Sequence, residues 1–313
     1  MSRAFIFPGQ GSQAVGMGKV VAESYAAARE VYQEVDQALG QNLSTLMFEG
    51  PEDELTLTEN AQPALMAASM AVIRVLQAEA GFNIVDHVSH VAGHSLGEYS
   101  ALCAVGTFSL ADTAQLLKTR GKAMQDAVPV GEGAMAALLG LDLADAEAVA
   151  EEARQGEVCD FANDNATGQV VVSGAVAAVE RAIEIAKAKG AKRAVLLPVS
   201  APFHCAMMAP AADVMAAALA EVMMNDPALP VVANVVARPV TMAAEVRKLL
   251  VEQVTGRVRW RECVLAMKSA GVDSVLEVGH GKVLSGMIKR IDRELTGSSI
   301  GTPEEIAAFL NEL

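Results

Sequence analysis

A serine between two glycines, in the segment Gly93-His94-Ser95-Leu96-Gly97, is the pattern in this chain best suited to nucleophilic chemistry. The G-x-S-x-G spacing also arises by chance, so its meaning depends on the surrounding elements. On a sharp turn from a strand to a helix, such a serine projects its hydroxyl into a cleft. A helix beginning at Leu96 would add free backbone N–H groups and a positive dipole end, which suit an oxyanion.

A serine hydroxyl is a weak nucleophile at neutral pH and needs a base, and the chain has five histidines. His94 is expected to point away from the line of attack, because neighbouring side chains diverge on a sharp turn, and to pack beneath it. His87 and His90 belong to the approaching strand and are expected at its edge or in the core. His204 and His280 both remain candidates from the residues alone, with His204 favoured because it precedes a helix at a domain junction.

Other chemical patterns are weaker. The segment GSQAVGMGK has the first spacing of a phosphate-binding loop but lacks its G-K-[ST] ending, and no G-x-G-x-x-G occurs. No histidine–carboxylate cluster has the spacing of metal ligands. We therefore expect no nucleotide-binding loop, no metal and no cofactor.

The composition indicates a globular acidic protein. Hydrophobic residues make up 52% and charged residues 20% of the 313 residues, so a sizeable core can form. The net charge of −14 disfavours nucleic acid and anionic membranes as partners, and no run approaches 18 apolar residues. Four separated cysteines without a C-x-x-C pair, and an amino-terminal segment that turns at Pro8 and Gly9, favour a reduced, cytoplasmic setting.

Strands alternating with helices predict an α/β fold with a mostly parallel sheet covered on both faces. Short strands are predicted at 4–7 and 87–93, and helices at 61–81 and 109–127. Ser95 then lies on a strand-to-helix turn. Arg120 borders the apolar line of the 109–127 helix.

The stretch 129–198 has the order β-α-β-β-α-β of a ferredoxin-like unit. Its middle strands, EVCDFAN and QVVVSG, are expected to be joined by a turn at DNATG. We predict a ferredoxin-like small domain at 129–198, inserted into a large domain formed by 1–128 and 199–313. The alternative is that these elements extend the main sheet.

Several segments together resemble the bacterial malonyl-CoA:acyl carrier protein transacylases, and the resemblance covers nearly the whole chain. The similar segments are FPGQGSQ (7–13), AQPAL (61–65), GHSLGEY (93–99), the helix bearing Arg120, GEGAMAALLG (131–140), NDNATGQVVVSG (163–174), APFHCAMM (201–208), VEQVTGRVRW (251–260) and LEVGHGKVLSGMIKR (276–290). The resemblance implies an α/β-hydrolase-like large domain with a ferredoxin-like insert.

The resemblance also implies roles for individual residues. Ser95 would be the nucleophile and His204 its base. The backbone N–H groups of Gln10 and Leu96 would form the oxyanion hole, and the carbonyl of Gln253 would orient the histidine in a dyad.

The resemblance also bears on His280 and Arg120. Relatives often carry proline where this chain has His280, which favours His204 as the base. Arg120 would bind the free carboxylate of a malonyl group with two parallel hydrogen bonds. Without the resemblance, the favoured interpretation of Arg120 is a helix arginine that pairs with a carboxylate of the next helix.

The implied activity is transfer of a malonyl group from malonyl-CoA to the phosphopantetheine thiol of acyl carrier protein, in fatty acid or polyketide chain extension. The implied mechanism is ping-pong through a malonyl-serine, with coenzyme A released and no metal or redox cofactor. A serine hydrolase or thioesterase, a scaffold that only binds carrier protein, and transfer of other acyl groups such as methylmalonyl are the alternatives. We expect a monomer, because no strong extra apolar face is evident.

Acyl carrier protein is acidic, as is this chain, so docking would need a local positive patch. One candidate is the pair Lys289 and Arg290. The other is the insert segment KAKGAKR, with Lys187, Lys189, Lys192 and Arg193. Either group could equally be an ordinary solvated surface.

Overall fold

The computed structural model describes residues 2–199 and 201–313, and a six-stranded sheet is at its centre. The strand order is β10-β9-β1-β2-β7-β8, with neighbouring strands parallel except for the antiparallel pair β7 and β8. The predicted mostly parallel sheet is therefore confirmed. The strands span Arg3–Phe7 (β1), His90–Gly93 (β2), Val231–Ala233 (β7), Arg238–Val240 (β8), Ser274–Val278 (β9) and Thr296–Ile300 (β10).

Both faces of this sheet are covered, as β1 illustrates. Phe5 and Phe7 belong to one apolar core, whereas the alternating Ala4 and Ile6 belong to another. The second core is closed by α13 (Trp260–Ser269) and α14 (Ile288–Ile291). Helices that contribute to the first core are α1 (Lys19–Ser24), α2 (Ala26–Leu39), α3 (Leu43–Glu49), α4 (Glu52–Thr56), α5 (Thr58–Ala80), α6 (Ile84–His87), α7 (Gly97–Ala104), α8 (Leu110–Asp126), α11 (Ala209–Glu221), α12 (Ala243–Thr255) and α15 (Pro303–Leu310).

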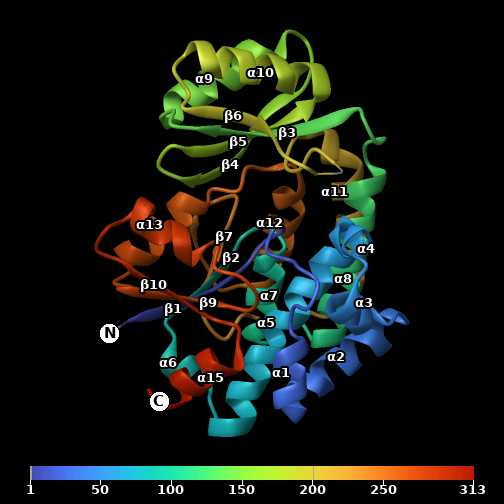
Figure 1. Cartoon of the computed structure of the whole chain (residues 1–313), viewed down its shortest axis with the longest axis vertical. Helices are drawn as coiled ribbons and strands as arrows, with labels where there is room; N and C mark the ends of the chain where they lie inside the picture. The colour runs from blue at the N-terminus through green and yellow to red at the C-terminus, as the bar shows by residue number, and fades with distance from the viewer. Residues whose placement is uncertain (1, 200) are drawn as a thin grey trace.

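A second, antiparallel sheet lies above the first in Figure 1, with order β4-β5-β3-β6. Its strands are β3 (Gly133–Leu139), β4 (Cys159–Ala166), β5 (Gln169–Ala175) and β6 (Arg193–Leu196). Helices α9 (Leu143–Arg154) and α10 (Val176–Ala188) cover its outer face with a core of their own. Met135, Ala162 and Val171 point from its inner face into the main core, so the two sheets pack into one body.

Two local predictions differ from the structure in their bounds. The turn predicted at DNATG joins the two strands but occupies only its last two positions, 167–168. Strand β4 continues through 164–166 with irregular register, and the buried Asp164 pairs with Arg261 at 2.9 Å. Tertiary pairing thus keeps turn-prone residues in a strand. The strand predicted from His87 begins at His90, because 84–87 forms the short helix α6.

The two loops that matter most for function lie at the same end of the main sheet. Phe7 at the end of β1 pairs in parallel with Gly93 at the end of β2. A Cβ on Gly97 would stand 2.3 Å from the Phe7 carbonyl oxygen, and one on Gly93 would stand 1.9 Å from the Gly97 carbonyl. Only glycine permits this approach, so the turn carrying Ser95 lies directly against the loop after β1.

Within the described residues, no helix has the length and apolar character needed to cross a membrane. No group of three or more His, Cys, Asp or Glu side chains there could hold a metal ion. All four cysteines are free and buried.

Candidate active site

Ser95 occupies the turn between β2 and α7 with a left-handed backbone, at φ 54°. A residue with a side chain seldom adopts this conformation, and the surrounding structure must maintain it. The Ser95 N–H donates to Asn234 Oδ1 at 2.7 Å, and Asn234 Nδ2 donates to the Gly93 carbonyl at 2.8 Å. Asn234, buried just after β7, therefore ties the strained turn to the neighbouring strand.

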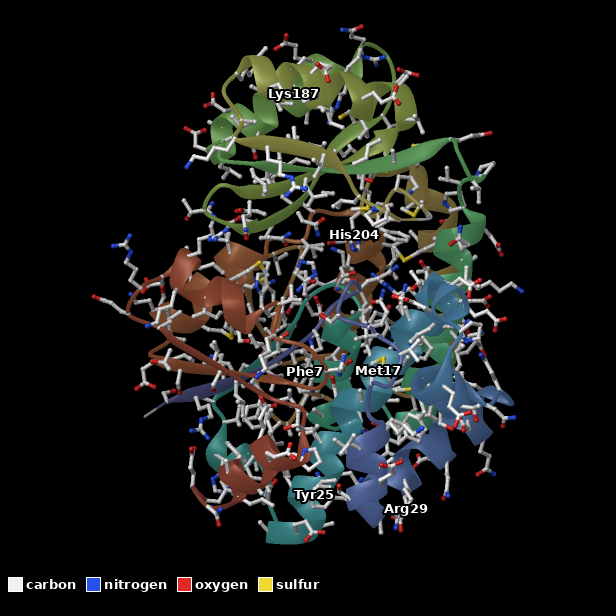
Figure 2. All side chains as sticks on the ribbon, viewed as in Figure 1. Phe7, Met17, Tyr25, Arg29, Lys187 and His204 are labelled. Carbon is white, nitrogen blue, oxygen red and sulfur yellow. The ribbon has the colours of Figure 1, made fainter. Side chains whose placement is uncertain are left out.

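His204 lies within hydrogen-bonding range of the serine, although the two residues are 109 positions apart. The distance from Ser95 Oγ to His204 Nε2 is 2.8 Å, and His204 Nδ1 is 2.7 Å from the Gln253 carbonyl oxygen. A carbonyl only accepts, so Nδ1 carries the proton and donates, which leaves Nε2 free to accept from the serine hydroxyl. Figure 2 shows His204 in the middle of the molecule, below the small sheet.

The His204 imidazole is only 3% exposed, and its surroundings keep it neutral. Burial, followed by the nearby positive charge of Arg120, lowers the pKa of His204 to about 3. The hydrogen bond to the Gln253 carbonyl acts in the opposite direction. A neutral imidazole with a free Nε2 is the form that can accept a proton.

Arg120 reaches the same serine from α8. Its Nη2 donates to Ser95 Oγ at 3.1 Å and to Gln253 Oε1 at 2.9 Å, and its Nη1 donates to Gln62 Oε1 at 2.7 Å. A Cβ on Gly121 would stand 2.5 Å from the Thr58 carbonyl oxygen, so this glycine allows α8 to approach α5 closely. That approach brings the guanidinium beside Gln62.

The guanidinium is almost completely buried, with 1% exposure, yet its hydrogen-bond partners are neutral. Among the described residues it forms no ion pair with a carboxylate, so the helix–helix pairing considered from the sequence is absent. Its Nε has no hydrogen-bond partner there either. A buried cation with neutral partners is poised to bind an anion.

The backbone N–H groups of Gln10 and Leu96 were predicted to form an oxyanion hole. Neither N–H donates a hydrogen bond to any described residue. Leu96 is the N-cap residue of α7, where a free N–H is expected, and Gln10 lies in the adjacent loop after β1. The Gln10 side chain donates to Thr58 Oγ1 at 3.2 Å, which fixes that loop to α5.

Four groups of the site were not found from the sequence: Gln62, Glu98, Asn234 and the side-chain amide of Gln253. All are buried and reach the site only through tertiary contacts. Burial raises the pKa of Glu98 to about 7, against the opposing effects of hydrogen bonds from Asn234 and Gln253 and of the Arg120 charge. Gln62, Glu98 and Gln253 do lie inside the similar segments AQPAL, GHSLGEY and VEQVTGRVRW, whereas Asn234 lies in none of them.

Two other histidines, His94 and His280, lie in the quoted segments but form no hydrogen bond with the Ser95 hydroxyl in the described structure. His94 Nε2 is 2.8 Å from Asn165 Oδ1 and its ring lies 5.7 Å from that of Trp260, so the prediction that it packs beneath the turn is confirmed. His280 is partly buried in the loop after β9. In the described structure it forms no hydrogen bond with Ser95 or His204.

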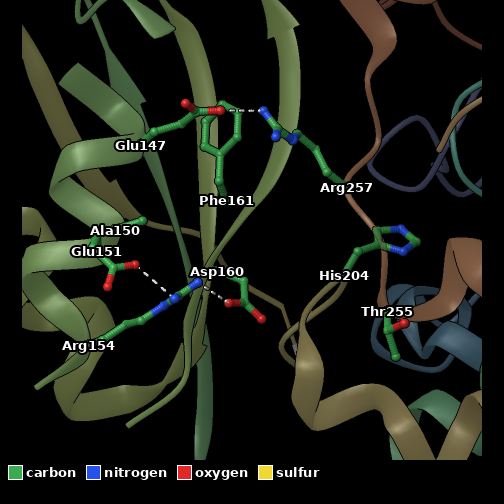
Figure 3. A pocket seen from close by; sticks show the side chains of 9 residues that line it. All are labelled: Glu147, Ala150, Glu151, Arg154, Asp160, Phe161, His204, Thr255 and Arg257. Atoms are coloured by element: carbon green, nitrogen blue, oxygen red, sulfur yellow. Dashed lines mark hydrogen bonds and ion pairs between the residues drawn. The ribbon is translucent and has the colours of Figure 1, made fainter. Parts of the chain in front are cut away.

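A cavity of about 360 Å³ opens between the small sheet with α9 on one side and the end of α12 on the other, and His204 is part of its wall. Figure 3 shows Glu147, Phe161 and Asp160 on one side, with Arg257 and His204 on the other. Arg257 donates to Glu147 at 2.7 Å and lies over the Phe161 ring at 4.7 Å. A side chain from each part of the fold thus lines the approach to the imidazole.

The predicted docking residues line a separate surface. Lys289 and Arg290 are exposed on α14 and, with Arg293, line a hollow of about 610 Å³. Arg290 also lines an adjacent hollow with Lys192 and Arg193 of the small sheet. Among the described residues these five cations form no ion pair, whereas Lys187 pairs with a glutamate on its own helix and Lys189 with one on α9.

The family model for the acyl transferase domain matches residues 4–301. The malonyl CoA-acyl carrier protein transacylase of Escherichia coli K12 is 48% identical over 307 residues, which cover 98% of each chain. The enzyme of the same name from Bacillus subtilis is 43% identical over 311 residues, covering 99% of this chain and 96% of that one.

Solved structures give the same result. An acyl-carrier-protein S-malonyltransferase from Bartonella henselae is 57% identical and has a TM-score of 0.97, covering 100% of this chain and 99% of that one. A malonyl-transacylase solved in complex with a type II PKS acyl-carrier protein is 41% identical, with a TM-score of 0.96 over all of both chains.

The lowered pKa of His204 predicts that its imidazole stays neutral well below neutral pH. Nitrogen-15 NMR of the imidazole should show a neutral ring with the proton on Nδ1 from pH 8 down to below about pH 5, because burial and Arg120 both oppose protonation. The His204→Gln variant assigns the signals. Protonation at the ordinary value near 6.5 would contradict the electrostatics described here.

Proposed function

The chain belongs to the acyl transferase domain family, and from that premise we propose that it transfers malonyl groups from malonyl-CoA to the phosphopantetheine thiol of acyl carrier protein. This reaction would supply fatty acid or polyketide chain extension. The observation that carries the proposal is the meeting of two groups at Ser95 Oγ: a neutral imidazole at 2.8 Å and a buried guanidinium at 3.1 Å. The first suits proton removal and the second suits a distal carboxylate.

Acylation begins when His204 Nε2 takes the hydroxyl proton of Ser95 and Oγ attacks the thioester carbonyl. The N–H groups of Gln10 and Leu96 stabilise the resulting oxyanion. The intermediate collapses, the C–S bond breaks, and the coenzyme A thiolate takes the proton from His204. A malonyl-serine ester and free coenzyme A result.

Transfer reverses these steps. The phosphopantetheine thiol gives its proton to His204, and the thiolate attacks the ester carbonyl. The C–O bond to Ser95 breaks, and Oγ recovers the proton from the imidazole. In this ping-pong sequence only one thiol, that of coenzyme A or of phosphopantetheine, occupies the site at a time.

Arg120 gives the site its preference for malonyl groups. A guanidinium meets a carboxylate through two parallel hydrogen bonds, and the acetyl group of acetyl-CoA offers no such partner. When the malonyl carboxylate binds, Arg120 Nη2 donates to it in place of Ser95 Oγ, and the serine hydroxyl is freed. Gln62 holds the other nitrogen in place at 2.7 Å.

We assign 1–128 and 199–313 to an α/β-hydrolase-like large domain and 129–198 to a ferredoxin-like small domain. The parallel sheet and the element order β3-α9-β4-β5-α10-β6 support this division. The same proposal places carrier docking at Lys289 and Arg290, whose hollow continues to the small sheet. A cytoplasmic location and a monomeric state complete it, and the four free cysteines fit a reducing setting.

Mixing the protein with malonyl-CoA should add one malonyl group to its intact mass, because the ester accumulates when no carrier is present. Ser95→Ala should remove the adduct. Ser100→Ala, a buried neighbour on α7 whose hydroxyl has no partner among the described residues, is the matched control and should keep it. Steady release of free malonate would favour a hydrolase instead, and no adduct at all would favour a scaffold.

Arg120→Ala should lower kcat/KM for malonyl transfer, because the carboxylate loses a paired hydrogen-bonding partner. The loss of transition-state stabilisation should be ~2 kcal/mol or more. Acetyl transfer should fall far less. Arg120→Lys keeps the charge but not the planar pair of donors, so it should recover only part of the loss. Equal losses for both substrates would remove the carboxylate-binding role.

The double variant Lys289→Glu/Arg290→Glu should raise the KM for acyl carrier protein about tenfold or more while leaving acylation by malonyl-CoA intact, since a repelling charge replaces an attracting one. Arg238→Glu/Lys248→Glu makes the same charge change at exposed positions on β8 and α12, near the opposite edge of the sheet. Unchanged carrier kinetics in the first variant would exclude α14 from docking.

A further inference from the structure

A buried carboxylate that the mechanism above does not use lies one turn beyond the serine. Glu98 is in the first turn of α7 and is 2% exposed. Its Oε2 accepts from the backbone N–H of Asn234 and from Gln253 Nε2, each at 2.9 Å. A carboxylate in such a place needs a compensating charge or donors, so its partners show what it does.

The Gln253 side chain connects Glu98 to Arg120. Its Nε2 donates to the carboxylate at 2.9 Å, and its Oε1 accepts from Arg120 Nη2 at 2.9 Å. A carboxylate only accepts and a guanidinium only donates, so the amide can have only this orientation. The amide dipole lies between an anion and a cation and is favourable to both.

The charges act on each other across this amide. Burial lowers the pKa of Arg120, and the ionised forms of Tyr99 and Glu98 would oppose that shift. Burial also raises the pKa of Tyr99, so of the two only Glu98 can carry a negative charge near neutral pH. Conversely, the Arg120 charge favours the ionised form of Glu98. Because no carboxylate touches the guanidinium among the described residues, Glu98 is the carboxylate that offsets its buried charge from a distance.

We propose that Glu98 is a positioning residue that serves as the resident counter-ion of Arg120 and competes, through Gln253, with the carboxylate of the malonyl group. The inference rests on the proposed function. When the substrate carboxylate reaches Arg120, two anions share one cation, and Glu98 moderates the strength with which the malonyl group is held. The acetyl group brings no second anion and is unaffected by this competition.

The competition has a proton-linked consequence. A second anion at Arg120 makes the ionised form of Glu98 less favourable, so malonyl binding draws a proton onto Glu98. The other titratable groups that interact with Glu98 are Arg120, Tyr99 and Cys263. Burial raises the pKa of Tyr99 and of Cys263 well above neutrality and Arg120 stays protonated, so none of them takes up a proton near pH 7.5. His204, which the Arg120 charge also affects, has a pKa of about 3 and stays neutral at that pH.

Calorimetry on the Ser95→Ala protein tests the inference without turnover. We expect malonyl-CoA to bind more tightly than acetyl-CoA at pH 8, where Glu98 is ionised because its pKa is about 7. Adding Glu98→Gln keeps an acceptor oxygen but removes the charge. Malonyl-CoA should then bind about fivefold more tightly or better, while acetyl-CoA changes less than twofold. Glu277→Gln, another fully buried glutamate, on β9, is the matched control and should alter neither affinity.

A second measurement leaves Glu98 unchanged, so it does not depend on folding of the variant. Binding of malonyl-CoA near pH 7.5, in two buffers of different ionisation enthalpy, should show net proton uptake, and binding of acetyl-CoA should not. Unchanged or weaker malonyl-CoA binding in Glu98→Gln, or no proton uptake in the Ser95→Ala protein, overturns the inference alone. Equal affinities of the Ser95→Ala protein for malonyl-CoA and acetyl-CoA overturn the proposed function, and the inference with it.

Discussion

A buried guanidinium whose hydrogen-bond partners are neutral controls the electrostatics of this site. Arg120 is 1% exposed, and its hydrogen bonds to other described residues go to amide and hydroxyl oxygens. Its charge is a cause of the lowered pKa of His204 and opposes the raised pKa of Glu98. A direct carboxylate partner would stabilise the arginine but would also occupy the donors that an anionic substrate needs. The neutral shell keeps those donors available.

The fold brings these groups together from segments distant in the sequence. Ser95 and Asn234 follow neighbouring parallel strands, where the carboxyl ends of the strands meet. Arg120 comes from α8, which Gly121 allows to pack closely on α5. His204 lies in the segment by which the chain leaves the small sheet, and Gln253 near the end of α12 fixes its tautomer. The seam between the two sheets is thus where Ser95 and His204 meet.

Local pattern was enough to predict the parallel sheet, the long helices α5 and α8 and the turn that carries Ser95, because each depends on nearby residues. The base could not be chosen between His204 and His280 from the residues alone, since that choice depends on long-range packing. The same limit hid Asn234 and Glu98, whose importance comes from contacts with residues more than a hundred positions away. The family resemblance supplied His204, Gln253 and Arg120, and their roles stay predictions.

The low pKa of His204 raises a chemical difficulty that the substrate itself can relieve. An imidazole with a pKa of about 3 is free to accept a proton but holds it weakly, which makes a poor base. Of the causes, burial is permanent, whereas the Arg120 charge can be offset by an anion beside it. If Arg120 binds the malonyl carboxylate as proposed, that anion would offset this second cause and stabilise the imidazolium as it forms. Acetyl-CoA brings no such anion, so the proposed role of the arginine extends to the transition state as well as to binding.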